Sequence, residues 1–271
     1  MSIIVSPGVV LGFSPTSLSL PRLLYDDVFM DGTITATTED TDAEALNVAD
    51  GLTWDYWRPT ALPARIEVQL TEVREVDYMM VAAHDLGTNE VSVRPQYHDG
   101  SGWVDAAAEY RPGSDDVMAM LFERVESTRF AVYLDGETSP EALPSLGVVM
   151  MGRALVVQRG QPLSHRPARW SKQTEVRPLV SEGGLYLGRS IRREGVSLNV
   201  RFQHLEADWV RRNLDPFIDH ARTRPFGWLW HPQDYPPEAA LLWTEEGDIQ
   251  PEHAGLPNRV NVSFKARGVT R

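Results

Sequence analysis

The residues best suited to bind a ligand form an aromatic cluster near position 55. Trp54, Tyr56 and Trp57 lie close together, and Arg58 follows them directly. An aromatic ring packs well on the C–H face of a pyranose, while Arg58 or Asp55 would bond to the sugar hydroxyl groups. The cluster therefore predicts a glycan-binding platform made by Tyr56, Trp57 and Arg58, whereas Trp54 is expected to fill the core. The competing interpretation places these rings, Trp54 above all, in the core of a β-sandwich.

Two His-Asp pairs are further candidates for a sugar or metal site. His84-Asp85 and His98-Asp99 stand at the ends of predicted strands, and Trp103 follows the second pair. Turn chemistry alone accounts for Asp99, since Asp-Gly is a common turn sequence. His84 and Asp85 are the residues of these pairs that we predict to bind a glycan.

An acidic segment offers oxygen ligands for a cation. Asp40, Asp42 and Asp50 could hold a structural calcium ion through carboxylate and carbonyl oxygens. The spacing of an EF-hand loop is absent, and acidic loops are more often simply solvated. We expect no other cofactor.

Sequence motifs of catalysis are missing. The chain has no Gly-x-Ser-x-Gly, no His-Glu-x-x-His, no Walker-type loop and no Gly-x-Gly-x-x-Gly. We therefore expect a protein that is not an enzyme. A carboxylate pair for glycan cleavage is a spatial feature that sequence does not reveal, so a role beside a glycan depolymerase stays open.

Composition indicates two units with different surroundings. The net charge of −12 divides into −17 for residues 1–150 (8 Lys+Arg against 25 Asp+Glu) and +5 for residues 151–271 (18 against 13). We expect no specific nucleic-acid binding, and the basic half is better explained by contacts with other subunits. The absence of cysteine excludes disulfides, and no signal peptide or membrane anchor is expected.

Period-2 alternation and turn signals predict a mainly β protein. In residues 64–70, Ile66, Val68 and Leu70 alternate with polar residues, as in a half-buried strand. The other strands are predicted at 76–87, 91–104 (a hairpin), 118–125, 128–136, 153–160, 195–202, 225–230 and 259–268. One helix is predicted at 206–222, which Pro216 would kink or divide. One or two helical turns are predicted at 43–49, with Thr41 or Asp42 as the N-cap.

The first half resembles the galactose-binding-like (discoidin-type) jelly roll. The resemblance covers about residues 20–155 and is carried by Asp50-Gly51, by the segment from Thr53 to Trp57 and by the spacing of the strands that follow. It implies two antiparallel sheets around one core. We predict a short N-terminal arm at 1–20, this jelly roll at 21–152 and a second β-sandwich or barrel with one flanking helix at 153–271.

The second half resembles the C-terminal domain of minor tail or distal tail (baseplate) proteins of long-tailed bacteriophages. The resemblance is carried by Ser181-Glu182-Gly183-Gly184, Gly188-Arg189-Ser190, Pro216-Phe217, Pro225-Phe226, Trp228-x-Trp230-x-Pro232 and Tyr235-Pro236. It implies a virion protein of the tail tip, made in the host bacterial cytoplasm, whose copies close into a ring that continues the tail tube. Six-fold symmetry is favoured over three-fold.

The tail resemblance also implies partners and an interface. The expected partners are sister copies, other tail-tip proteins, the tail tube, the tape-measure protein and host surface polysaccharide. The predicted interface residues are basic or aromatic: Arg189, Arg192, Arg193, Phe226, Trp228, Trp230 and Tyr235. The alternative is a free-standing lectin-like protein that binds carbohydrate.

Overall fold

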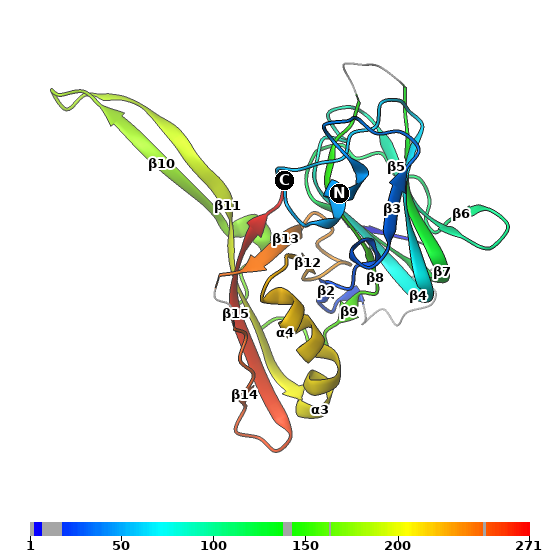
Figure 1. Ribbon diagram of the computed structural model, residues 1–271. Coiled ribbons are helices and arrows are strands. Elements are labelled where there is room, and N and C mark those ends of the chain that lie inside the picture. Colours follow the sequence, from blue (N-terminus) through cyan, green and yellow to red (C-terminus); the bar gives the residue numbers. More distant parts are fainter. Residues whose placement is uncertain (1–2, 7–17, 138–142, 163, 246–247) are drawn as a thin grey trace.

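Two β-sheets make up most of the molecule, as the computed structural model shows (Figure 1). The structure describes the chain except for residues 1–2, 7–17, 138–142, 163 and 246–247. Most of the predicted N-terminal arm and residues 138–142 of the predicted jelly roll lie outside the described residues. The predicted mainly β fold, a jelly-roll sandwich with a second β unit and one flanking helical segment, is confirmed.

Among the described residues the first sheet contains seven strands, and it curls into the sandwich. Its main path runs β3-β4-β7-β5-β6, with β1 parallel to β7 and β8 antiparallel to β4. Its strands are β1 (Ile3–Val5), β3 (Thr33–Ala36), β4 (Ala64–His84), β5 (Ser92–His98), β6 (Trp103–Asp105), β7 (Met118–Asp135) and β8 (Leu146–Gly152).

Two long strands replace four short predicted ones. Residues 64–70 and 76–87 were expected as separate strands, but β4 is continuous over 21 residues, and β7 likewise joins two predicted strands. Their antiparallel pairing shifts register between Gln69 and Arg74 and again between Val76 and Tyr78. Such bulges bend a strand without ending it, so both strands serve both layers of the sandwich. The alternation expected at Ile66 is confirmed, since its side chain is buried.

In the part of the chain that the structure describes, the second sheet contains eight strands in the order β10-β11-β15-β13-β12-β2-β9, with β14 beside β15. Its strands are β2 (Arg22–Leu24), β9 (Leu155–Val156), β10 (Lys172–Val180), β11 (Tyr186–Glu206), β12 (Phe226–Leu229), β13 (Ala239–Thr244), β14 (Glu252–His253) and β15 (Arg259–Val269). Strand β2 comes from the segment assigned to the jelly roll, yet it pairs with β12 and β9. The chain therefore crosses between the sheets near its beginning.

One helical segment covers the second sheet. It consists of α3 (Ala207–Trp209), a π-helical turn η4 (Val210–Leu214) and α4 (Asp215–Ala221), which confirms the predicted helix. Pro216 lies in the first turn of α4, where a missing N–H is tolerated. The predicted interruption of the helix is present as the π-helical turn directly before α4. Among the described residues, no helix is long and apolar enough to cross a membrane.

Short 3-10 helices complete the described elements: η1 (Val28–Met30), η2 (Ala45–Ala49) and η3 (Ala168–Trp170). The helical turns expected at 43–49 are present as η2, but neither Thr41 nor Asp42 caps them. Glu44 holds the N-cap position and makes no side-chain bond there.

The two sheets share an apolar interface. Tyr78 and Met80 of β4 and Leu121 of β7 pack against Leu24 of β2 and Leu241 of β13, and all five are buried. This cluster lies between the sandwich core and the core beneath the helix. The halves are therefore one packed body, not two modules on a flexible linker.

Candidate interaction surfaces

A long hairpin projects from the second sheet. Strand β10 pairs antiparallel with the first half of β11, from Lys172↔Val196 outward to Val180↔Tyr186. Only the second half of β11, from Val196 on, also pairs with β15. We call residues 172–195 the arm, and Figure 1 shows it pointing away from both sheets. Nine residues of β10 at about 3.3 Å each give it a reach of roughly 30 Å.

The arm is apolar but unburied. Every residue of β10 is exposed. Seven large apolar side chains of the arm are exposed: Val176, Leu179, Val180, Leu185, Tyr186, Leu187 and Ile191. Leu185, Tyr186 and Leu187, at 71%, 66% and 66% exposure, form its apolar tip. A two-stranded ribbon without a covering layer is marginal in water, and its free edges invite pairing with another chain. The arm therefore has the properties of a surface that binds another protein chain.

The predicted interface residues divide into two groups. Arg189 and Arg192 are exposed on the arm, and Arg192 lies 3.7 Å from Glu175 in a weak surface pair. The side chain of Arg193 lies outside the described residues. Phe226 and Trp228 are fully buried in the core of their own chain, so their prediction as interface residues is wrong. They pack under the helical segment, which the aromatic count alone did not reveal.

The remaining aromatic pair stays near the surface. Trp230 and Tyr235 stack with ring centroids 4.7 Å apart, and the indole N–H of Trp230 bonds to Glu238. Tyr235 is 44% exposed. Their role in an interface stays a prediction.

The aromatic cluster of the jelly roll has a distribution opposite to the expected one. Trp57 is completely buried, and its indole N–H donates to the Thr38 carbonyl at 3.1 Å, so it cannot stack on a sugar. Trp54, which was expected to fill the core, is 73% exposed. Tyr56 is partly exposed, with the Arg58 guanidinium 5.1 Å from its ring centroid.

His84 and Asp85 have structural partners. The buried His84 ring contacts the Asp116 carbonyl at 3.0 Å through Nε2 and accepts the Leu86 N–H through Nδ1. Burial lowers the pKa of His84, which favours a neutral ring. Asp85 accepts the Ser145 N–H at 2.6 Å. These bonds fix the loop between β4 and β5 and explain both residues without a glycan.

The acidic segment is not organised around an ion. Among the described residues, no group of three or more His, Asp or Glu side chains is placed to hold a metal. Asp40 accepts the Asp42 N–H and Asp50 accepts the Leu52 N–H, so two of the three predicted ligands stabilise local turns. The calcium prediction gains no support from this arrangement.

The loop that carries Trp54 lies over the second unit and forms a hollow of about 390 Å³. Gly51 makes this approach possible, since its φ is +77° and a Cβ there would lie 2.7 Å from Pro225 Cγ. Leu52, Trp54 and Trp243 line the hollow, and all three are exposed. Asn47 Nδ2 donates to the Asp55 carboxylate and the Tyr56 carbonyl, which ties η2 to this loop.

We call the exposed apolar side chains of this hollow and of the adjoining segment 46–56 the aromatic patch. It consists of Leu52, Trp54 and Trp243, which line the hollow, and of Leu46 and Tyr56 from the same segment as Trp54. The patch combines exposed apolar area with the acidic segment 39–56.

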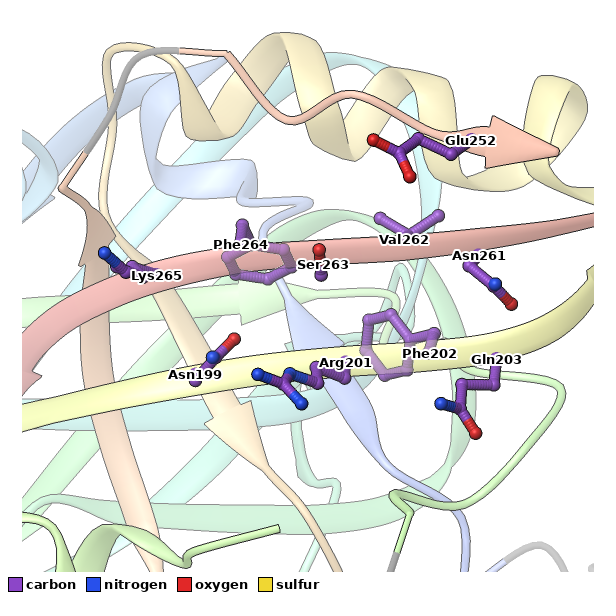
Figure 2. Close-up of a pocket in the computed structure, with 10 residues that line it drawn as sticks. All are labelled: Asn199, Arg201, Phe202, Gln203, Glu252, Asn261, Val262, Ser263, Phe264 and Lys265. Atoms are coloured by element: carbon purple, nitrogen blue, oxygen red, sulfur yellow. The ribbon is translucent and has the colours of Figure 1, made fainter. Parts of the chain in front are cut away.

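A polar groove of about 420 Å³ crosses β11 and β15 (Figure 2). Its side chains are mainly amides, hydroxyls and cations, with Glu252 of β14 as the one carboxylate among the lining residues. Hydrolysis of a glycoside commonly needs two carboxylates, so this groove offers hydrogen bonds but no such chemistry. The lining residues are Asn199, Arg201, Phe202, Gln203, Glu252, Asn261, Val262, Ser263, Phe264 and Lys265.

The most perturbed carboxyl is structural. Asp27, fully buried beside η1, accepts the backbone N–H groups of Phe29 at 3.0 Å and Met151 at 3.2 Å. Burial raises its pKa to about 7, and these two bonds oppose the shift only in part. Because Asp27 is buried and joins η1 to β8, we assign it a role in stability.

Comparison with known proteins gives similarity only to solved structures. No protein-family model and no curated protein sequence matches the chain. A carbohydrate-binding module from Clostridium perfringens in complex with GalNAc-β-1,3-galactose has 15% identity and a TM-score of 0.41, with 47% of this chain and 99% of that chain covered. The family 32 module from C. perfringens NanJ in complex with galactose has 15% identity and a TM-score of 0.40, covering 49% and 98%.

A third similar structure is chitosan-binding module 2, in complex with chitotriose, from the chitosanase/glucanase of Paenibacillus sp. IK-5. It has 13% identity and a TM-score of 0.40, with 47% and 100% of the two chains covered. Identities at this level concern the fold and not the ligand.

Proposed function

We propose that this chain is a non-catalytic structural subunit that assembles with copies of itself, and that the assembly is a ring at the tail tip of a long-tailed bacteriophage. The observation that carries the proposal is the arm, which displays seven large apolar side chains and two free strand edges to solvent. Such a surface is stabilised when another chain buries it. The placement in a phage tail rests on the sequence resemblance of residues 150–271.

Self-association is tested by two matched substitutions. Leu187 on the arm and Val73 on β4 are similarly exposed, at 66% and 61%. Leu187→Asp should shift the chain from a multiple of its 30.4 kDa mass toward the monomer, whereas Val73→Asp should leave the assembly unchanged. Light scattering over a range of protein concentrations measures both. A wild-type chain that stays monomeric at all concentrations would refute self-assembly.

Placement in the virion needs a separate test. An antibody against this chain, viewed by electron microscopy, should label the tail tip of the phage that encodes it. Label elsewhere on the particle, or none, would remove the tail assignment and leave self-assembly standing.

A carbohydrate-binding protein is the second candidate, because Trp54 and Tyr56 present rings to solvent and Arg58 lies beside the Tyr56 ring. Exposed aromatic rings with a hydrogen-bond donor nearby are suited to bind a sugar. Binding of a glycan array by a monomeric chain, lost in Trp54→Ala, would favour this candidate over the structural one.

A further inference from the structure

We infer that the arm of one copy docks its apolar tip into the aromatic patch of the next copy. The inference rests on the proposed self-assembly and specifies which two surfaces meet. It places the contact between the second unit of one chain and the junction of the two units in its neighbour.

Exposed apolar area is concentrated on these two surfaces. Among the described residues, sixteen large apolar side chains are exposed, of which seven belong to the arm and five to the aromatic patch. The other four are scattered over separate elements: Val73, Trp170, Tyr235 and Leu256. The aromatic patch is therefore the apolar surface of this chain best able to cover the arm of a sister copy.

Shape agrees with this pairing. The arm ends in a narrow knob, Leu185, Tyr186 and Leu187, and the aromatic patch surrounds a hollow of about 390 Å³. Trp54 and Trp243 line this hollow, and aromatic residues in such pockets commonly dominate binding energies. A projecting knob and a hollow form a heterologous contact, which closes a ring when the rotation between copies is suitable.

Charge agrees as well. Residues 172–195 contain five Lys or Arg and three Asp or Glu, a formal charge of +2, whereas residues 39–56 contain six Asp or Glu and no Lys or Arg, a formal charge of −6. Arg222 and Arg224 also line the hollow, which brings the formal charge of the receiving surface to −4. Among the described residues, no ion pair involves these six carboxylates or Arg177 and Arg189 of the arm. Opposite charges on facing surfaces steer association and select the partner, and here both signs are free for an intermolecular contact.

Cross-linking between single-cysteine chains tests the contact, because the natural chain has no cysteine. Leu187→Cys protein is mixed under assembly conditions with Thr53→Cys protein, because Thr53 is exposed and lines the same hollow while Trp54 is kept, and the mixture is treated with a short bismaleimide. A covalent heterodimer should form in this mixture. The matched mixture of Leu187→Cys with Val73→Cys should give at least tenfold less. Light scattering on the same samples reports whether they assemble.

The outcomes separate the inference from the proposed function. Samples that assemble but link Leu187→Cys equally to both positions, or mainly to itself, overturn the inference and leave self-assembly intact. Samples that do not assemble overturn both. If Trp54→Ala abolishes binding of a glycan but leaves assembly unchanged, the patch holds a sugar and the inference is wrong.

A charge exchange gives an independent readout. Arg189→Glu or Glu44→Lys alone should weaken self-association roughly fivefold at low salt, and the double variant should recover most of that loss. Additive losses in the double variant would contradict the pairing of these two surfaces.

Discussion

Replacing the buried Asp27 by Asn should remove a pH-dependent contribution to stability. The folded state raises the pKa of this carboxyl from 3.8 to about 7, mainly through burial. The folded chain therefore holds a proton between about pH 4 and 7 that the unfolded chain has lost. By linkage, Asp27 lowers the free energy of unfolding progressively as the pH rises from about 4 to 7, and the loss is complete above that range.

The size of this effect follows from the shift. About three pKa units at about 1.4 kcal/mol each give roughly 4 kcal/mol. Asn keeps an Oδ1 acceptor for the N–H groups of Phe29 and Met151, but burial of its amide N–H₂ costs about 1–3 kcal/mol at every pH. Asp27→Asn should therefore be about 1–3 kcal/mol more stable than the wild type at pH 8.5 and about 1–3 kcal/mol less stable at pH 4. The change between the two conditions is about 4 kcal/mol.

Urea unfolding at both pH values measures this change. The Leu187→Asp background should be used, so that assembly does not add to the stability. Burial also lowers the pKa values of His84, His165 and His220, which makes stability fall toward acid in wild type and variant alike, so only the difference between them reports Asp27. Glu44→Gln on the exposed N-cap of η2 is the control and should show no such change. A stability difference between Asp27→Asn and wild type that is equal at pH 4 and 8.5 would refute the reasoning.

Three further substitutions test the packing. Trp57→Ala should lower the free energy of unfolding by about 3–5 kcal/mol, since it removes a fully buried ring and its bond to Thr38. Trp54→Ala, at a 73% exposed position, should change the stability of the monomer by less than about 0.5 kcal/mol in the same urea assay. Gly152→Ala should lower the free energy of unfolding by about 1–3 kcal/mol or more, because the added Cβ would overlap the Asp26 carbonyl oxygen. A melting temperature equal to that of the wild type would contradict this close approach of Gly152 to Asp26.

Sequence patterns predicted the element types better than their extent. Alternation at Ile66 and its neighbours identified a half-buried strand because one face of β4 meets the sandwich core. The same pattern could not show that β4 continues through residues 71–75, between the two predicted strands. A bulge changes which side chains point inward, so a continuous strand has the sequence pattern of two strands and a loop. The pairing of β2 with β12 was equally invisible, since a three-residue strand carries almost no periodicity.

The candidate surfaces show a different limit. Trp54 and Trp57 belong to one short segment and have the same side chain, and only the direction of the loop decides which ring enters the core. The arm was not predicted from the sequence. The turn at Ser181 contributes there only to the resemblance to phage tail proteins, and it does not by itself indicate the two strands that it connects. The sequence does contain a signal there, since residues 172–194 mix apolar and charged residues without assigning either kind to one face. Such a pattern fits a strand pair exposed on both faces.

Charge also limits how copies of this chain can assemble. Residues 1–150 carry −17, so close contact between the acidic halves of two copies is unfavourable. Two arms placed side by side would bring like charges of +2 together, whereas arm against patch joins +2 with −4, the charge of residues 39–56 together with Arg222 and Arg224 of the hollow. Electrostatics therefore disfavours both symmetric arrangements and favours the head-to-tail one. Because a head-to-tail contact uses a different surface on each partner, an open chain of copies keeps one free arm at one end and one free patch at the other until a ring closes. A closed ring leaves no arm exposed, and that would explain why a chain with so much apolar area on one hairpin need not aggregate.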